Sequence, residues 1–184
     1  MGKVTIIKKS RKECKCGKCG NIIPVGSRYY RGELNFARDI IRCDTCKLEA
    51  WEVTTSDYQL QVGRIANKWR DDYECSAEGA ENIAADLEEI RDDLQDRLDN
   101  MPYQLQDSDT GMLLQERIDN LDSVIEELND IDEDSLKDDV LSEYDDGDAD
   151  DEELEWDDDN EEMTSALEEK IGDAIDEAIS NIEY

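Results

Sequence analysis

Six cysteines are the residues of this chain best suited to chemistry, and five of them lie between positions 14 and 46. Four form two Cys-x-x-Cys pairs, Cys16 with Cys19 and Cys43 with Cys46, separated by 23 residues. Two thiolates three positions apart on a tight turn can occupy adjacent corners of a tetrahedron. We expect these four cysteines to hold a structural Zn²⁺, because four thiolates leave no coordination position open for a substrate.

Two cysteines are left over. Cys14 is close enough along the chain to replace Cys16 as a ligand, and the alternative is a spare thiol outside the tetrahedron. Cys75 stands alone in an acidic stretch, where we expect a small structural residue. Gly17 and Gly20 flank the first pair, and glycine lets backbone N–H groups turn toward the sulfur atoms.

A small β region must position the two cysteine pairs. The intervening residues, IIPVGSRYYRGELNF, predict a β-hairpin around Pro24-Val25-Gly26. The second pair, in RCDTCKLEAW, leads into a short helix. This order is typical of a zinc ribbon or a treble clef. The metal would supply folding free energy that a module of about 40 residues does not obtain from its own core.

Charge divides the chain into two dissimilar parts. The whole chain has 184 residues, 20 Lys and Arg, 52 Asp and Glu, no His, and a net charge of −32. Residues 1–47 hold 12 basic and 4 acidic residues, whereas residues 48–184 hold 8 basic and 48 acidic residues. The acidic part is therefore unable to bind a nucleic-acid backbone. Because His and a Gly-rich phosphate loop are both absent, we expect no enzymatic activity.

From residue 53 onward, apolar residues recur at steps of three and four, which predicts helices. Thr54, Thr55 and Ser56 are candidate N-caps of the first helix, and Ser76 is the candidate N-cap of the second. The first long seam comprises Ile83, Leu87, Ile90, Leu94, Leu98 and Met101, and the second comprises Leu114, Ile118, Leu121, Ile125 and Leu128. Two seamed helices with a short connection predict an αα-hairpin, and a homodimeric coiled coil is the competing arrangement.

The C-terminal region is more acidic still. Between 143 and 162, 14 of 20 residues are Asp or Glu and none is basic, which predicts a solvated linker. A last amphipathic helix follows, with Ser165 and Glu168 as its capping box. Its apolar stripe comprises Leu167, Ile171, Ile175, Ala178 and Ile182.

The predicted fold is a small four-cysteine zinc ribbon or treble-clef module followed by a mainly α-helical acidic region. Its parts are a basic arm (1–12), the zinc module (13–52), the acidic helical hairpin region (53–131), an acidic flexible linker (132–162) and the amphipathic helix (163–184). No apolar run approaches 18 residues and the N-terminus lacks a signal-peptide pattern, so we expect a cytoplasmic protein.

The helical region carries charge at nearly the density of DNA. Residues 77–101 and 111–131 hold 15 acidic residues. At roughly 1.5 Å per residue, two such helices side by side offer about one carboxylate per 2.5 Å, against about one charge per 1.7 Å for B-DNA. We expect this array to bind a basic DNA- or RNA-binding protein. The candidate contacts are Glu88, Glu89, Asp92, Asp93, Asp96, Glu126 and Glu127.

The basic arm is a candidate for direct nucleic-acid contact. Lys8, Lys9, Arg11 and Lys12 precede the aromatic residues Tyr29, Tyr30 and Phe36, and basic residues beside exposed aromatics are typical of nucleic-acid surfaces. The alternative is that the aromatics form the small core of the module. The arm would then pair with the acidic tail of its own chain.

The segment KSRKECKCGKCGNIIPVGSRYYRGELNFARDIIRCDTC, followed by an acidic helical tail, resembles small zinc-finger proteins encoded by bacteriophages. The resemblance rests on the CxxCG knuckle, the I-x-x-G-x-x-Y segment and the RCxxC pair, and it covers roughly residues 9–56. It implies a phage protein acting in the host cytoplasm. Acidic DNA mimics are a recurrent phage strategy, so the resemblance also implies interference with a host defence or DNA-processing protein.

Three functions follow from these features. The first is a DNA-mimic inhibitor or adaptor that binds a basic host protein through the acidic helices. The second is a zinc-finger nucleic-acid-binding or transcription regulator, whose acidic tail autoinhibits it or recruits a partner. The third is a structural or assembly protein, dimeric through its coiled coil. The sequence leaves all three open.

Overall fold

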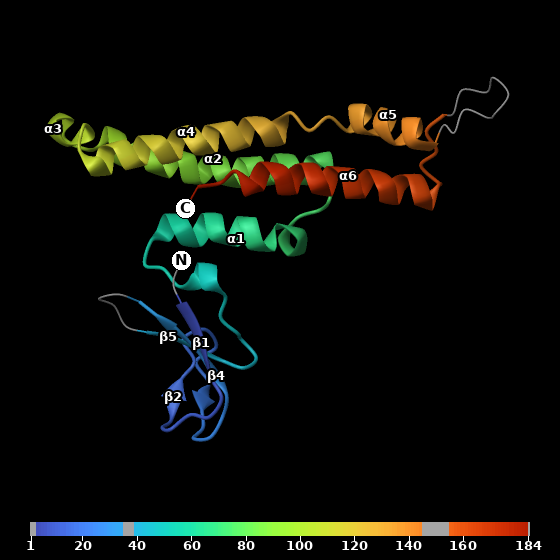
Figure 1. The fold of residues 1–184 in the computed structure, drawn as a ribbon. Coiled ribbons are helices and arrows are strands. Elements are labelled where there is room, and N and C mark those ends of the chain that lie inside the picture. Colours follow the sequence, from blue (N-terminus) through green and yellow to red (C-terminus); the bar gives the residue numbers. More distant parts are fainter. Residues whose placement is uncertain (1–2, 35–38, 145–154, 184) are drawn as a thin grey trace. The chain divides into compact units, whose positions relative to one another are not determined.

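A computed structural model describes residues 3–34, 39–144 and 155–183 (Figure 1). The chain divides into two compact units, residues 1–64 and residues 65–184. The first unit, hereafter the β unit, contains all the described strands and the four paired cysteines. The second, hereafter the helical unit, contains the long helices. The division falls inside α1 (Asp57–Asp72), which contributes residues to both units.

Two small antiparallel sheets form the β unit. One has the order β1-β4-β5, built from β1 (Lys3–Ile7), β4 (Tyr29–Glu33) and β5 (Ile40–Cys43). The other pairs β2 (Cys14–Lys15) with β3 (Ile22–Ile23). A short 3₁₀ helix, η1 (Ala50–Glu52), follows the second cysteine pair, as the sequence indicates. The fold class predicted from the sequence is therefore confirmed for this part of the chain.

The predicted β-hairpin around Pro24-Val25-Gly26 is wrong in its pairing. The turn itself is present, since Gly26 has φ +87° and Ser27 donates its N–H to the Pro24 carbonyl at 3.2 Å. The turn joins β3 to β4, however, and these strands belong to different sheets. The physical reason is that the first cysteine knuckle turns β2 back onto β3. This leaves β4 to pair with β1 and β5.

Part of the predicted basic arm is a strand. β1 pairs with β4 along its whole length, from Lys3 opposite Glu33 to Ile7 opposite Tyr29. The run of β-branched residues from Val4 to Ile7 favours this conformation. Beyond the strand, Ser10 is buried and exchanges backbone hydrogen bonds with Gly26 and Ser27. The basic segment is therefore anchored to the β unit on both sides of Lys8 and Lys9.

The helical unit is built around the predicted αα-hairpin. α2 (Ala77–Asp99) packs along α4 (Asp109–Asn129), and the short α3 (Tyr103–Gln106) connects them (Figure 1). Ser76 and Ser108 cap the two long helices, accepting hydrogen bonds from the N–H groups of Gly79 and Gly111. Ser56 plays the same part for α1, where it accepts from the N–H of Gln59 at 3.4 Å.

The predicted seams form the core of the hairpin. Ile83, Leu87, Leu121 and Val124 are fully buried. Leu98, Met101 and Leu114, at the ends of the two seams, are only half-buried. The helix spacing read from the sequence is therefore confirmed, and the hairpin buries its two seams within one chain.

The C-terminal helix, α6 (Glu161–Ser180), packs against α4 and α5. Its predicted capping box at Ser165 and Glu168 is wrong. The cap is Asn160, whose side chain accepts hydrogen bonds from the N–H groups of Glu162 and Met163. Asn caps as well as Ser, and the acidic residues after Asn160 favour the positive end of the helix, so the helix begins at the earlier signal. The predicted apolar stripe is buried throughout.

A further helix, α5 (Glu133–Tyr144), lies within the predicted flexible linker. Glu133 lies in its first turn and pairs with Lys137 at 2.8 Å, while Val140 is fully buried. Packing against α6 stabilises a segment whose composition alone indicates a solvated chain. Residues 145–154 of the predicted linker lie outside the described residues. None of the helices in the described parts of the chain is long and apolar enough to cross a membrane.

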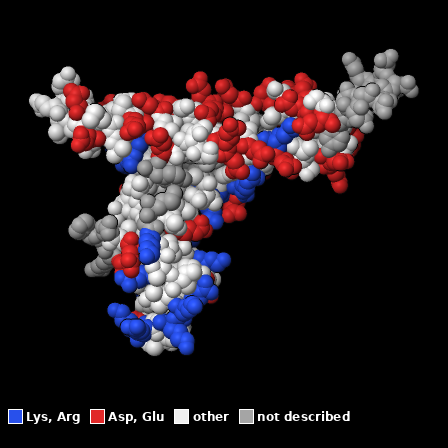
Figure 2. All heavy atoms as spheres, in the orientation of Figure 1, with Lys and Arg blue, Asp and Glu red and all other residues white. Residues whose placement is uncertain are grey.

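The two units carry opposite net charges. Residues 65–184 hold 45 acidic and 7 basic residues, and residues 1–64 hold 7 acidic and 13 basic residues. Acidic side chains are spread over the visible face of the long helices, whereas Lys and Arg are frequent on the β unit (Figure 2).

Gly111→Ala is expected to destabilise the helical unit, although Gly→Ala in a helix usually stabilises it by up to about 1 kcal/mol. An added Cβ would lie 2.0 Å from the Gln106 carbonyl oxygen, a backbone atom that cannot move aside. We expect a loss of about 1–3 kcal/mol in the free energy of unfolding. Urea denaturation followed by circular dichroism measures it. The exposed neighbour Thr110→Ala is the control, and equal stability of the two variants would contradict the prediction.

Candidate metal centre and acidic surface

The first cysteine pair lies on the tight connection between β2 and β3. The N–H of Cys16 donates to the Asn21 carbonyl at 2.9 Å, and the N–H of Gly20 donates to the Cys16 carbonyl at 3.0 Å. Gly20 has φ +75°, a conformation that glycine adopts without strain. The N–H of Gly17 donates to the Ile41 carbonyl at 2.8 Å, which attaches this knuckle to β5.

The second pair repeats this arrangement at the end of β5. The N–H groups of Cys46 and Lys47 both donate to the Cys43 carbonyl, at 3.1 and 3.0 Å. Lys47 has φ +43°, and it follows Cys46 as Gly20 follows Cys19. Each knuckle thus turns through a left-handed residue directly after its second cysteine. Lys47 is the one described non-glycine residue with positive φ.

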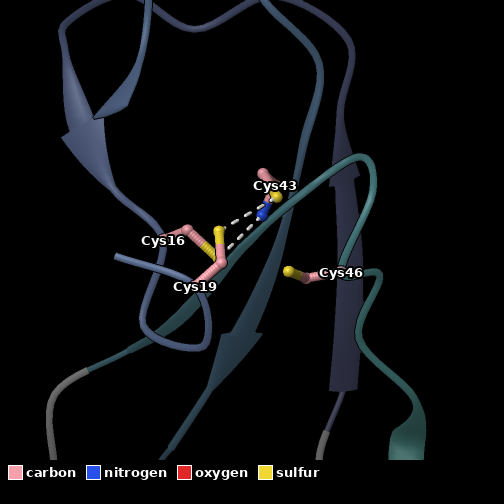
Figure 3. A group of neighbouring side chains, drawn as sticks. All are labelled: Cys16, Cys19, Cys43 and Cys46. Carbon is pink, nitrogen blue, oxygen red and sulfur yellow. Dashed lines mark hydrogen bonds between the residues drawn. The ribbon is translucent and has the colours of Figure 1, made fainter. Parts of the chain in front are cut away.

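The two knuckles bring four sulfur atoms together (Figure 3). The Sγ atoms of Cys16, Cys19, Cys43 and Cys46 all lie within 4.8 Å of one another, and those of Cys19 and Cys43 are 3.8 Å apart. A tetrahedral ion with metal–sulfur bonds of about 2.3 Å requires sulfur–sulfur distances of about 3.8 Å. These four cysteines therefore fit a tetrahedral four-thiolate metal site. Cys14 lies in β2 opposite Ile23 and is not part of the cluster.

The thiols of the cluster differ in acidity. Burial acts to raise the pKa of Cys16, but hydrogen bonds from backbone N–H groups, those of Cys19 and Cys43 foremost, outweigh burial and lower it to about 6. The pKa of Cys43 is lowered chiefly by the backbone N–H of Cys46. The pKa of Cys46 is raised to about 12, first by hydrogen bonding with the Cys43 sulfur and then by burial. Four thiolates in such proximity repel one another, and a bound cation removes that penalty.

Arg42 lies directly against the first knuckle. Its Nη1 would be 2.8 Å from a Cβ added to Gly17, so the glycine is needed to make room for the guanidinium. A four-thiolate site with a divalent ion carries two net negative charges. A guanidinium packed on the knuckle offsets part of this charge. The sequence did not single out Arg42, although it directly precedes Cys43.

The predicted basic contacts are all at the surface. Lys8, Lys9, Arg11 and Lys12 are exposed, and within the described residues none of them has an ion pair. Arg28 and Arg31 of the same unit differ, because they pair with Asp44 and Asp39. Of the aromatic residues expected beside the basic segment, Tyr29 and Tyr30 are half-buried in β4. Phe36 lies outside the described residues.

The seven acidic residues predicted to contact a partner are all exposed on the hairpin. Glu88, Glu89, Asp92, Asp93 and Asp96 project from α2, and Glu126 and Glu127 project from α4. The helix pattern explains this placement, because these positions alternate with the buried seam residues.

Two of the seven also have partners within the helical unit. Asp92 pairs with Arg91 at 3.2 Å, and Arg91 also reaches Asp122 on α4 at 3.6 Å. Glu127 accepts a hydrogen bond from the Asn181 side chain at 2.9 Å, which helps to hold the end of α6 on α4. The other five carboxylates have no ion pair with any described residue.

The C-terminal helix adds acidic residues that the seam analysis missed. The exposed side chains of Glu168, Glu169, Asp173 and Glu177 lie on α6, which packs beside α4. Trp69 and Arg70 hold α6 in place by donating to the two carboxylate oxygens of Asp176, at 2.7 and 2.6 Å. A helical wheel of residues 161–180 identifies these side chains as the face opposite the apolar stripe. The helical wheel does not show which helices lie beside α6, whereas the structure places it against α4 and α5.

An acidic hollow of about 470 Å³ lies between the end of α1 and the start of α2. Asp72, Glu74, Glu78 and Asp86 line it, and the Tyr73 hydroxyl donates to Asp86. Among the described residues, the four cysteines are the one group whose ligand atoms lie close enough together to hold a metal ion. The hollow therefore extends the acidic surface without forming a second metal cluster.

No protein-family model, curated protein or solved structure matches this chain. The chain combines a four-cysteine cluster in an N-terminal β region with the helices that follow it.

Lys47→Gly is expected to stabilise the β unit by about 0.5–1 kcal/mol, because glycine removes the strain of a left-handed lysine. Gly20→Ala, at the equivalent position of the first knuckle, should instead destabilise it by about 1–2 kcal/mol. Hydrogen exchange of the β4 amides in the full chain, at a constant metal load, measures both changes. Lys15→Gly in strand β2 is the control and should destabilise slightly. A loss of protection in Lys47→Gly would refute the explanation.

Proposed function

We propose that this chain is a non-enzymatic binding protein whose acidic helices dock onto a basic, nucleic-acid-binding protein by presenting carboxylates in place of phosphates. The observation that carries the proposal is the row of exposed carboxylates on α2 and α4 that no described cation neutralises. Glu88, Glu89, Asp93, Asp96 and Glu126 make up this row, hereafter the acidic row.

The charge density of the hairpin supports the proposal. α2 and α4 together carry 15 acidic and 3 basic residues. α2 has 23 residues and is about 35 Å long at 1.5 Å per residue, so the hairpin offers about one carboxylate per 2.3 Å. B-DNA offers about one phosphate charge per 1.7 Å. A basic groove shaped for nucleic acid would therefore find a comparable array here.

The packing of the hairpin supports the proposal as well. A flexible acidic chain loses conformational entropy when it binds, whereas charges on a packed hairpin are already in place. The fully buried Leu87 and Leu121 hold α2 against α4, and the exposed carboxylates project from the other sides of the same helices. The resemblance to phage zinc-finger proteins adds a context, in which the partner is a host defence or DNA-processing protein and binding inhibits it.

Neutralising the acidic row is the first test. We expect a variant with all five residues replaced by Gln or Asn to lose retention of basic DNA- and RNA-binding proteins from a bacterial lysate. Proteins bound to the wild-type chain should be released by double-stranded DNA as well as by salt, because both compete for the same basic surface.

A control variant with the same net charge tests whether binding depends on the position of the acidic row or only on the total charge of the chain. The control neutralises five exposed acidic residues away from the hairpin: Asp134, Asp138, Asp139, Glu155 and Asp157. It should retain the same proteins with a nearly unchanged salt dependence. If both variants lose retention of these proteins equally, binding depends on net charge alone, and the proposal is contradicted.

A second candidate function is nucleic-acid binding by the β unit. It is favoured by the exposure of Lys8, Lys9, Arg11 and Lys12 without ion pairs in the described part of the chain. Basic side chains that lack internal partners are available for phosphates. This function would be supported if the wild-type chain retains nucleic acid from the lysate and the variant with these four residues replaced by Ser does not.

We further infer that the four-cysteine cluster holds Zn²⁺ in a structural role. The donor set and the 3.8 Å sulfur–sulfur distance suit this ion, and four thiolates would leave it no open position for a substrate. The metal would join the β2–β3 knuckle to the end of β5. The buried apolar residues of the β unit outside α1 are few, Ile23, Leu48 and Val53 among them, so the metal would supply much of its folding free energy.

Metal removal should unfold the β unit and leave the helical unit helical. We expect one zinc per chain, and Co²⁺ in its place should show the absorption bands of a tetrahedral thiolate complex. Chelation should abolish hydrogen-exchange protection in β4 while protection in α2 persists. Cys46→Ser should lose the metal, whereas Cys14→Ser should keep it. Unchanged β4 protection after complete metal removal would show that the site is not structural.

A further inference from the structure

The end of the α2–α4 hairpin displays large apolar side chains to solvent. Tyr103 is 79% exposed, Met112 57%, Leu105 51% and Leu113 44%. These four residues, hereafter the apolar tip, lie within eleven positions of one another. The other large apolar residues that are exposed in the described chain all belong to the β unit.

Contacts within the connection hold the apolar tip in place. The Gln106 side chain donates to the carbonyls of Leu98 and Met101, at 3.3 and 3.2 Å, and so closes the end of α2. The N–H of Ser108 donates to the Leu105 carbonyl at 3.0 Å, and Gly111 lies against the backbone of Gln106. The backbone that carries the exposed side chains is therefore fixed before any partner binds, which lowers the entropic cost of binding.

The core of the hairpin does not account for these side chains. The seam residue Ile118 is buried and Leu114 is half-buried, whereas Met112 and Leu113, on the same helix, face solvent. A surface helix needs apolar residues on one face only. Contiguous exposed apolar residues with a polar rim are a feature of interaction sites, and Tyr and Met are enriched in such sites.

Charge around the apolar tip indicates what covers it. Residues 96–116 hold five acidic residues and one basic residue. Asp99, Asp107, Asp109 and Glu116 are all exposed, and acidic side chains flank the end of the hairpin in Figure 2. A second copy would bring the same negative rim and would be repelled. A surface with apolar residues ringed by Lys and Arg is complementary in both respects.

We propose that the apolar tip is the anchor through which the helical unit docks into an apolar pocket with a basic rim on its partner protein. The inference rests on the proposed function and adds a short-range contact to it. The acidic row draws the basic partner in at long range, and burial of Tyr103, Leu105, Met112 and Leu113 then slows dissociation. The affinity for the partner thus has two contributions. The one from the acidic row falls as salt increases, and the one from the apolar tip does not.

Two synthetic helical peptides of equal length and equal positive charge test the inference on the full chain. One peptide combines Lys with Leu on one face, and the other replaces every Leu with Ser. We expect the Lys/Leu peptide to bind more tightly, and the double variant Tyr103→Ser with Leu113→Ser to lower its affinity about tenfold. Fluorescence anisotropy over a NaCl series should show this loss as a constant factor, with the salt slope unchanged.

Two controls test whether the loss of affinity is specific to the apolar tip. One removes exposed apolar side chains elsewhere, and the other checks that the double variant is folded. Ile22→Ser with Val25→Ser removes two exposed apolar side chains from the β unit. This variant should bind each of the two peptides with the wild-type affinity. The tip residues are exposed, so the double variant should keep the wild-type circular dichroism spectrum and melting temperature. Amide chemical-shift changes on adding the Lys/Leu peptide should centre on residues 103–113.

The outcomes distinguish this inference from the function on which it rests. Equal affinity of the Lys/Leu peptide for the wild-type chain and the double variant would overturn the anchor and leave the acidic row intact. If neither peptide binds at low salt, the proposed function itself fails. If sedimentation shows self-association that the double variant abolishes, a second copy covers the tip and the basic partner is wrong.

Discussion

Like-charge repulsion is the constraint that the helical unit must satisfy, because residues 65–184 combine 45 acidic residues with only 7 basic ones. Apolar burial along the helix seams opposes it. Leu87, Leu121 and Ile175 are fully buried, and burying such a side chain contributes about 1.5–3 kcal/mol. With the seams turned inward, nearly all the described carboxylates face water, where they are hydrated and screened. The same arrangement that makes the unit stable therefore also places its carboxylates at the surface.

Three of the seven cations of the helical unit form ion pairs between neighbouring helices. Arg70 pairs with Asp176 at 2.6 Å and joins α1 to α6, Lys170 pairs with Glu143 at 2.8 Å and joins α6 to α5, and Arg91 reaches from α2 to Asp122 on α4. These cations relieve repulsion at the junctions and leave the exposed stretches of α2 unneutralised. The acidic surface is thus concentrated on the sides of the helices and not at their contacts.

The β unit differs from the helical unit in its source of stability. Its strands are two to five residues long, too short to bury a large core, and its net charge is positive. Two knuckles of the same backbone design converge on four sulfur atoms, and a central metal would replace the missing apolar contacts. Each unit therefore has its own source of stability, one from apolar seams and the other from thiolate chemistry.

The cysteine spacing and the seam periodicity were sufficient to predict the four clustered thiols, the αα-hairpin and the acidic face, because each is encoded by a regular spacing of one kind of residue along the chain. Longer-range features were not predictable in this way. The pairing of β4 with β1 and β5, the helix at residues 133–144 and the position of Arg42 against Gly17 all depend on which distant segments pack together. The cap at Asn160 is instead a local signal, which competed with the one at Ser165. The exposure of Tyr103 and Leu113 was likewise decided by tertiary structure, since a leucine in a helix is apolar wherever it points. Only the packing of α2 on α4 determines which leucines are buried and which remain at the surface.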